Sequence, residues 1–321
     1  ANKYIGLGRD LVAAKKKLAE LEAVTPACGS IAELIADTIT SRRKFVEQGK
    51  LSKRTVDDNE YEYAPNLIAA FGKMQPDALR LKHIWHYLHK ARGVETPVRA
   101  NKEISFLQVV MHQARSQGII EVNPCVGVER NEETPRDRLV TDDELRDFLR
   151  LARESGAVAT RAALAFYIAF VTGKAQGQIL KLSRGQLKDD GIDFGSRKGG
   201  ARVFVEWSDN LRAAVDESLA MPASIMPMFV VHTREGGPYT SDGFKKGWQI
   251  LMGQWVAGGT WADGSKREAG ERFTFHDGRA KAVTAVIEEG RKASELTGHR
   301  LESTVAKVYD RRRKRTSAPV R

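Results

Sequence analysis

The sequence predicts a mainly α-helical protein of two domains or more, with a small antiparallel β-sheet in the later one. Apolar residues recur at helical spacing along most of the chain. A charged segment with one proline, at 129–140, separates two such helical stretches and is typical of an exposed, flexible linker. The strongest alternation of period two occurs at 202–207, after a glycine-containing turn that follows Ile192 and Phe194. These observations favour a helical domain followed by an α+β domain.

The composition indicates a globular protein with a polyanionic partner. The 321 residues are 41% hydrophobic, which is enough to bury at least one substantial core. A net charge of +11 favours nucleic acid over a membrane, because no segment reaches the roughly 18 consecutive apolar residues that a span needs. A solvated basic surface without a partner is the alternative. The two cysteines have neither metal-ligand nor disulfide spacing and no secretory signal pattern occurs, so we expect a cytoplasmic protein.

The first helical domain is expected at residues 26–128. Ser30 is placed to cap its first helix, with Glu33 at the third position after the cap. Histidines at 83, 86 and 89 have helical spacing, but no carboxylate or cysteine accompanies them at matching spacing, so we expect no metal site. Basic residues near helix starts and on helix surfaces are candidates for phosphate contacts, with a solvated charged face as the alternative. These DNA-binding candidates are Lys53, Arg54, Arg99, Lys102 and Arg115.

The second domain begins with a capping box at 141–144. A helix at 161–171 is apolar nearly all round, which predicts the buried centre of this domain. Thr172-Gly173 ends that helix. The predicted hairpin carries Lys198 near its tip, and the glycine-rich, charged stretch 257–272 predicts a long loop.

A phosphate-binding helix start is predicted near the end of the chain. Asp277 can cap a helix, which places Arg279 in the first turn and His276 just outside it. A helix N-terminus beside an arginine suits a phosphate group. A capped surface helix with a chance histidine is the alternative.

Two further residues, His299 and Tyr309, belong to the candidate site. Gly298 can end the next helix in a left-handed cap and leave His299 at the head of the last one. On that last helix Tyr309 lies at the margin of an apolar stripe, where a tyrosine at the edge of the core is the alternative to a nucleophile. The basic run 311–315 follows, and we expect it to face DNA or an acidic surface.

From Ser30 to its end, the chain resembles a tyrosine recombinase of the phage-integrase type. The motifs that match in order are Thr172-Gly173, Gly177–Leu180, Lys198, Phe275–Ala282, Thr297–His299 and Tyr309. The resemblance implies a core-binding domain at 26–128, a linker at 129–140, a catalytic domain at 141–315, a tail at 316–321 and, at 1–25, the end of a truncated arm-binding domain.

The resemblance also implies roles for the motif residues. Tyr309 would attack a DNA phosphate and form a 3′-phosphotyrosine with release of a 5′-hydroxyl. Lys198 would protonate the leaving oxygen, and Arg279 would neutralise charge on the non-bridging oxygens. His276 would hydrogen-bond the phosphate and help accept the tyrosine proton, while His299 would support the same oxygens. No cofactor is required.

Three departures from the family pattern qualify these roles. Ala175 stands where the family has its first arginine, and without that arginine cleavage should fall by roughly 10³-fold or more, or about 4 kcal/mol of transition-state stabilisation. Since the surrounding residues fit the motif, an introduced arginine-to-alanine substitution explains Ala175 better than loss of the arginine during evolution does. Gly278 replaces an apolar residue, which predicts looser packing. The interval from His299 to Tyr309 is one residue longer than in the commonest members.

The leading hypothesis is therefore a site-specific DNA recombinase that is deficient in cleavage. An inactive DNA-binding or accessory protein with the recombinase fold is the alternative, and an unrelated nuclease is disfavoured because no cluster of acidic metal ligands occurs. The resemblance implies double-stranded recombination sites as partner, an accessory DNA-bending protein and a tetramer on DNA, with a monomer when free. It further implies that the protein lies in the cytoplasm of a bacterial host and associates with the nucleoid. The segment 316–321 is expected to pack on a neighbouring protomer.

Overall fold

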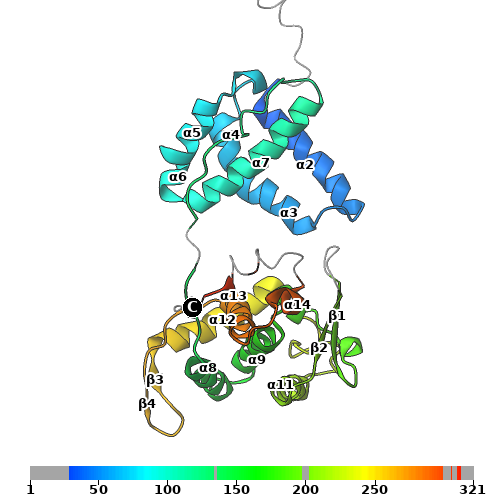
Figure 1. Cartoon of the computed structure of the whole chain (residues 1–321), viewed down its shortest axis with the longest axis vertical. Coiled ribbons are helices and arrows are strands. Elements are labelled where there is room, and N and C mark those ends of the chain that lie inside the picture. The colour runs from blue at the N-terminus through cyan, green and yellow to red at the C-terminus, as the bar shows by residue number, and fades with distance from the viewer. Residues whose placement is uncertain (1–28, 134–135, 197–201, 299–304, 306–308, 312–321) are drawn as a thin grey trace, which may run out of the picture. The chain divides into compact units, whose positions relative to one another are not determined.

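A computed structural model of the protein describes residues 29–133, 136–196, 202–298, 305 and 309–311. The chain forms two compact units, one ending at residue 134 and the other starting at residue 135 (Figure 1). The boundary between them falls inside the segment predicted as a linker. None of the helices in these described ranges is long and apolar enough to cross a membrane.

All the regular secondary structure among the described residues of the first unit is helical. Its elements are α2 (Ile31–Glu47), α3 (Lys53–Asp57), the π-helix η1 (Asp58–Tyr63), α4 (Ala64–Phe71), the 3₁₀ helix η2 (Pro76–Ala78), α5 (Leu81–His89), α6 (Arg92–Glu95) and α7 (Pro97–Ser116). The Ser30 hydroxyl accepts a hydrogen bond from the Glu33 amide, and the Glu33 carboxylate accepts one from Gly29, so the predicted cap is confirmed. Leu34, Leu67 and Leu107, from α2, α4 and α7, are buried in one core.

The first part of the predicted linker is ordered on the first unit, contrary to the expectation of a flexible segment. The Asn101 side chain in α7 accepts a hydrogen bond from the Asn131 amide at 3.0 Å and donates one to the Asn131 carbonyl at 2.8 Å. Arg130 donates to the Asn101 carbonyl at 3.1 Å. A buried asparagine on α7 therefore fixes residues 130 and 131, a contact that composition alone does not reveal.

The second unit combines helices with two short hairpins. Its elements are α8 (Asp142–Glu154), α9 (Ala157–Thr172), α10 (Gln176–Ile179), the 3₁₀ helix η3 (Arg184–Gln186), β1 (Gly191–Ser196), β2 (Arg202–Glu206), α11 (Asp209–Ala220), α12 (Ser241–Ala257), β3 (Gly259–Thr260), β4 (Lys266–Arg267), α13 (Phe275–Glu288) and α14 (Ala293–Thr297). The antiparallel pair β1 and β2 confirms the predicted hairpin. The second pair, β3 and β4, lies in the stretch predicted as a loop, where two-residue strands give no alternation to detect.

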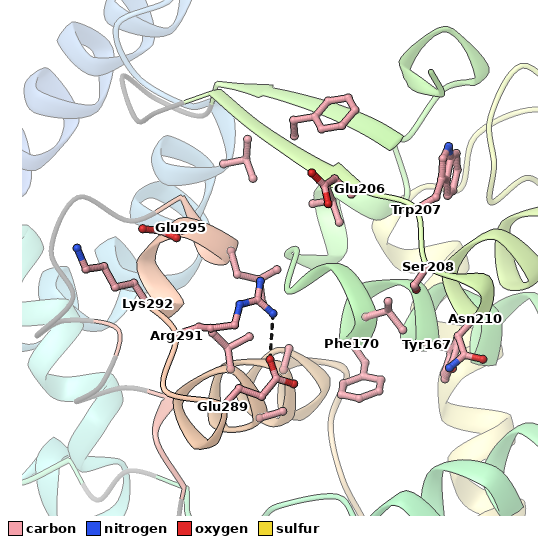
Figure 2. A pocket seen from close by; sticks show the side chains of 18 residues that line it. Tyr167, Phe170, Glu206, Trp207, Ser208, Asn210, Glu289, Arg291, Lys292 and Glu295 are labelled. Atoms are coloured by element: carbon pink, nitrogen blue, oxygen red, sulfur yellow. Dashed lines mark hydrogen bonds and ion pairs between the residues drawn. The ribbon is translucent and has the colours of Figure 1, made fainter. Parts of the chain in front are cut away.

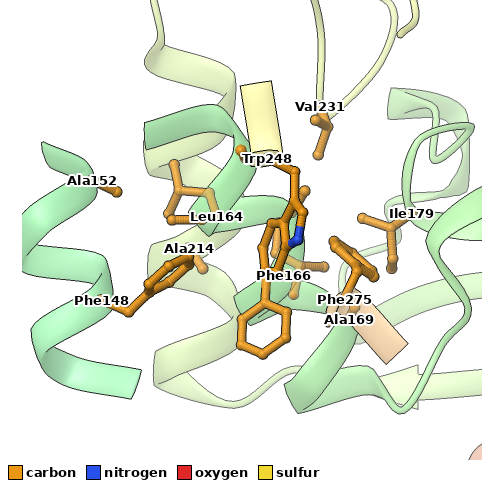
Figure 3. Close-up of a cluster of buried hydrophobic side chains, with 14 of the residues drawn as sticks. Phe148, Ala152, Leu164, Phe166, Ala169, Ile179, Ala214, Val231, Trp248 and Phe275 are labelled. Carbon is orange, nitrogen blue, oxygen red and sulfur yellow. The ribbon is translucent and has the colours of Figure 1, made fainter. Parts of the chain in front are cut away.

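Helix α9 is the centre of the second unit, as its nearly continuous apolar sequence predicts. It packs against α8, α10, α11, α12 and α13. Aromatic side chains fill the space around it (Figure 3): the Phe166 ring lies 5.3 Å from the ring of Trp248 and 5.7 Å from that of Phe275. Phe148 makes an edge-on contact with Phe166 at 6.1 Å. Edge-on and tilted arrangements at these distances are the ones that aromatic quadrupoles favour.

Gly278 makes this packing tight rather than loose, which corrects the expectation from the sequence. A Cβ atom at Gly278 would lie 2.7 Å from the Phe166 ring, closer than carbon atoms pack. Both residues are buried among the aromatic rings, so the ring has little room to move. The glycine thus permits α13 to approach α9 closely at the turn that carries His276 and Arg279.

We predict that Gly278→Ala lowers the free energy of unfolding by about 1–3 kcal/mol, because the added methyl group overpacks the contact with Phe166. Gly253→Ala is the matched control, since Gly253 also lies inside a helix but a Cβ atom there meets nothing within 4 Å. That control should gain up to about 1 kcal/mol from helix propensity. Urea denaturation followed by circular dichroism measures both, and equal stability of the two variants would contradict the tight contact.

Candidate active site

Two glycines in the left-handed conformation shape the loops around the candidate site. Gly173 ends α9 with φ 62° and Gly298 ends α14 with φ 71°. The sequence predicts a helix end at both positions, and a left-handed cap at Gly298. This backbone region is open to glycine at no steric cost. The turn at Gly173 leads the chain from α9 into Lys174 and Ala175, and the turn at Gly298 ends α14.

Arg279 joins these two turns from the first part of α13. Its side chain is fully buried, with 2% of the residue exposed. The Nη1 atom donates to the Gly173 carbonyl at 2.7 Å, and Nη2 donates to the Thr297 carbonyl at 3.1 Å. Carbonyl groups at helix C-termini carry partial negative charge, so they stabilise the buried guanidinium. Arg279 is therefore fixed in place by segments more than 100 residues apart in the chain.

Tyr309 lies directly against Arg279 and His276. The Arg279 guanidinium carbon is 5.3 Å from the centre of the Tyr309 ring, and the His276 and Tyr309 ring centres are 5.2 Å apart. Tyr309 is buried, with 8% exposed, beside Val283 and Val305. Three of the predicted site residues therefore meet in one place.

Helix α13 begins three residues earlier than the sequence suggested. Thr274 is its N-cap, so His276 lies inside the first turn and not before it. Asp277 is the third residue of the helix and not its N-cap, and it completes a capping box. Its carboxylate accepts hydrogen bonds from the Thr274 amide at 2.6 Å and the Thr274 hydroxyl at 2.8 Å. Burial, followed by the charge of Arg279, lowers the pKa of His276. A neutral imidazole at pH 7 can accept a proton from a neighbouring phenol.

A small hollow of about 90 Å³ opens beside these residues. Its lining comprises Lys174, Ala175, Gln176, Phe275, His276 and Arg279. The position where the family has an arginine thus borders the same space as Arg279 and His276. An arginine side chain at 175 would begin at the wall of this hollow, whereas alanine adds only a methyl group there.

Lys174 is a buried cation that the sequence did not single out. Only 1% of the residue is exposed, and its ammonium group donates to the Leu296 carbonyl at 2.7 Å near the end of α14. Burial, together with the charge of Arg279, lowers the pKa of Lys174 to about 7. A single lysine next to a glycine carries no signal of burial in a sequence, because its depth depends on how α14 folds over the turn.

Arg311 is also placed differently from the prediction. The sequence assigned it to a basic run facing DNA or an acidic surface, but its side chain is 5% exposed and forms a 2.6 Å ion pair with Asp277, itself 2% exposed. Burial alone would raise the pKa of Asp277, and the hydrogen bonds from Arg311 and Thr274 lower it below its usual value. This ion pair fixes the chain just after Tyr309.

The remaining predicted residues fall into two groups. Lys198 and His299 lie outside the described residues. The five DNA-binding candidates are exposed, but Arg54 pairs with Asp58 at 3.8 Å, and Arg99 pairs with Glu62. Within the described ranges, no group of three histidine, cysteine, aspartate or glutamate side chains lies close enough together to hold a metal ion.

Solved structures of integrases are similar to this chain. A lambda integrase dimer bound to a COC′ core site has a TM-score of 0.70 and 16% identity, with 98% of this chain and 92% of that chain covered. A lambda integrase tetramer bound to a Holliday junction has a TM-score of 0.66 and 17% identity, covering 99% and 93%. The chain has the tyrosine recombinase fold.

A third relative of this fold is the Tn1549 transposon integrase in complex with circular intermediate DNA, with a TM-score of 0.66 and 14% identity over 87% of this chain and 95% of that chain. No protein-family model and no curated protein sequence matches the chain. At such low identity, the likeness to recombinases is one of fold.

The lowered pKa of Lys174 predicts a pH dependence of stability. In the folded protein this lysine loses its proton near pH 7, whereas in the unfolded chain it keeps it up to about pH 10.4. The unfolded state therefore binds more protons between these values, and the stability of the protein rises with pH there. Lys174→Met removes this contribution, so its stability relative to the unmodified chain should fall by on the order of 2 kcal/mol from pH 6 to pH 9.

Urea denaturation of both proteins at several pH values measures this difference. Lys188→Met is the control, because the Lys188 ammonium group makes an exposed hydrogen bond to the Gly185 carbonyl. A stability difference for Lys174→Met that stays constant with pH would show that Lys174 titrates normally.

Proposed function

We propose that the protein is a site-specific DNA recombinase that cuts and rejoins DNA through a 3′-phosphotyrosine, in a form with weakened cleavage. The meeting of Tyr309, His276 and Arg279 beside the hollow at Ala175 carries this proposal. These residues are brought together from motifs far apart in the chain, in the fold that the integrases share. The net charge of +11 supports a DNA partner.

The proposed reaction needs no cofactor and no external energy source, because the phosphotyrosine bond replaces the DNA phosphodiester bond that is broken. The Tyr309 oxygen forms a bond to the phosphorus of a DNA phosphate, and the bond from phosphorus to the 5′-oxygen breaks. The phenol proton passes to His276, whose lowered pKa keeps it neutral before the reaction. Arg279 stabilises the charge that develops on the phosphate oxygens. Lys198 gives a proton to the departing 5′-oxygen, and His299 supports the same phosphate.

A DNA-binding or accessory protein that does not cleave is the second candidate function. Ala175 favours this function. Among the described residues, Arg279 is the only arginine that lines the hollow, and the family pattern would place a second arginine at position 175. Loss of one charge-stabilising arginine in phosphoryl transfer costs about 10³-fold or more in rate. DNA binding depends on many contacts and should survive this loss.

The decisive experiment restores the arginine. We expect Ala175→Arg to form a covalent protein–DNA adduct on a nicked suicide substrate at least about 10³ times faster than the unmodified chain. The DNA footprint of the protein on its host element supplies the substrate sequence. Ala175→Lys is a matched variant that restores a charge without the planar guanidinium, and it should recover less.

Tyr309→Phe in the Ala175→Arg background is the control for the nucleophile, and it should form no adduct. An adduct that persists in this control would contradict the assignment of Tyr309. DNA binding by Ala175→Arg without any adduct would exclude the recombinase proposal and support the second candidate.

For assembly, we propose a tetramer on DNA in which the segment 316–321 of one protomer packs on another. A groove of about 850 Å³ on the second unit supports this proposal (Figure 2). It lies between α9, β2, α13 and α14 and has apolar walls such as Phe170. Its charged lining residues among those described are Glu206, Glu289, Glu295, Arg291 and Lys292, of which Arg291 pairs with Glu289. The segment 316–321 contains Val320 and Arg321, so it can offer an apolar side chain to the walls and a basic one to Glu206 and Glu295.

Deletion of residues 316–321 should lower the fraction of protein in complexes larger than one protomer per site, measured by native gel mobility on DNA. Glu206→Lys with Glu295→Lys should give the same loss, because like charges would then meet in the groove. Glu268→Lys, an exposed carboxylate outside the groove that pairs with Lys266, is the control. Unchanged assembly after the deletion would exclude the proposed contact.

A further inference from the structure

The chain immediately after Tyr309 is held by a set of buried polar contacts that the reaction does not use. The Thr284 hydroxyl in α13 donates to the Tyr309 carbonyl at 3.2 Å and accepts from the Arg311 amide at 3.2 Å. One side chain thus connects the residue that carries the phenol with the residue two positions later. Thr284 is itself 2% exposed, so these bonds form away from solvent.

The Arg311 guanidinium makes a second contact with α13, two turns before Thr284. Its Nη1 atom is 2.6 Å from the Asp277 carboxylate and also donates to the Arg138 carbonyl. Asp277 lies between His276 and Arg279 in sequence, on the first turn of α13. Arg311, two positions after the proposed nucleophile, is therefore bonded to the helix turn that carries His276 and Arg279, both of which contact Tyr309.

A buried ion pair of this kind is poor evidence for a role in stability alone. Removing two charges from water costs about as much as their attraction returns, whereas leaving one of them unpaired is strongly unfavourable. Such pairs are better suited to fixing one arrangement of the chain than to raising overall stability. Here the arrangement that they fix is the distance of Tyr309 from His276 and Arg279.

We propose that Arg311 is a positioning residue, which through its ion pair with Asp277 holds Tyr309 against His276 and Arg279. This role rests on the proposed recombinase function for its catalytic consequence, but the contact itself can be tested without catalysis. When the pair is broken, the segment 309–311 leaves α13, and the phenol is no longer held beside its proton acceptor.

The first test measures release of the segment. Chymotrypsin cuts after tyrosine, and buried Tyr309 should be protected in the unmodified chain of residues 1–321. We expect Arg311→Gln and Asp277→Asn each to increase cleavage between residues 309 and 310 at least 10-fold, quantified by mass spectrometry under native conditions. The double variant should increase it no further than the single ones, because both act on one contact.

Two variants keep this test interpretable. Arg311→Lys retains a charge that can reach Asp277 and should restore much of the protection. Arg153→Gln is the matched control: it breaks a bidentate pair with Glu217 in the same unit, at 2.8 Å for both bonds, and should leave cleavage after Tyr309 unchanged. If Arg311→Gln does not increase cleavage, or if Arg153→Gln increases it equally, the positioning role is excluded.

The second test measures the reaction in the Ala175→Arg background. Arg311→Gln should lower the rate of adduct formation at saturating DNA at least 10-fold while changing DNA affinity less than twofold, and Arg311→Lys should recover part of the rate. An equal loss of affinity and rate would instead assign Arg311 to DNA binding and overturn the proposal. Absence of adduct in Ala175→Arg itself would exclude the recombinase function, and the chymotrypsin result would still decide whether Arg311 holds Tyr309.

Discussion

The arrangement of the site depends on one buried guanidinium. Arg279 donates to the carbonyl groups of Gly173 and Thr297, and these lie at the C-terminal ends of α9 and α14. A buried cation must have its donors satisfied, because an unpaired charge away from water is very costly. The turns at Gly173 and Gly298 must therefore lie where their carbonyl groups reach Arg279. As a result, Ala175 and Tyr309 are both close to the same arginine.

Charge in this region is distributed unevenly. Near the hollow, Lys174 and Arg279 bring two basic groups together, and their mutual repulsion, after burial, contributes to the lowered pKa of Lys174. On the other side of the first turn of α13, Asp277 is fully occupied by Arg311 and Thr274. Asp277, the only carboxylate of that turn, does not line the hollow, whereas the basic residues Lys174 and Arg279 do. This distribution of charge favours an anion in the hollow.

The aromatic core gives the site a rigid support. Phe166 lies in the centre of the second unit and contacts Phe275, the first residue of α13. The close approach at Gly278 brings the same helix against α9. Because close-packed interiors resist small displacements, the positions of His276 and Arg279 are tied to the packing of α9 rather than to a surface loop.

The sequence by itself determined the broad organisation and most of the local structure. A nearly continuous apolar sequence predicted the central helix α9, and alternation predicted the β1 and β2 hairpin. Glycines predicted the ends of α9 and α14, with a left-handed cap after α14. Each of these signals depends on neighbours in the chain. The ordered motifs pointed to the recombinase fold, which comparison with solved structures supports. The roles of Lys198 and His299 stay predictions.

Only the tertiary structure decided which charges are buried and what they contact. Lys174 and Arg311 look like surface residues in the sequence, since burial of a cation depends on carbonyl or carboxylate groups that arrive from distant segments. The same holds for Gly278, whose small size matters because of Phe166, more than 100 residues earlier in the chain. Local patterns record helix and strand propensity, whereas contacts between α9, α13, α14 and the segment at Tyr309 arise only when the chain closes around its core.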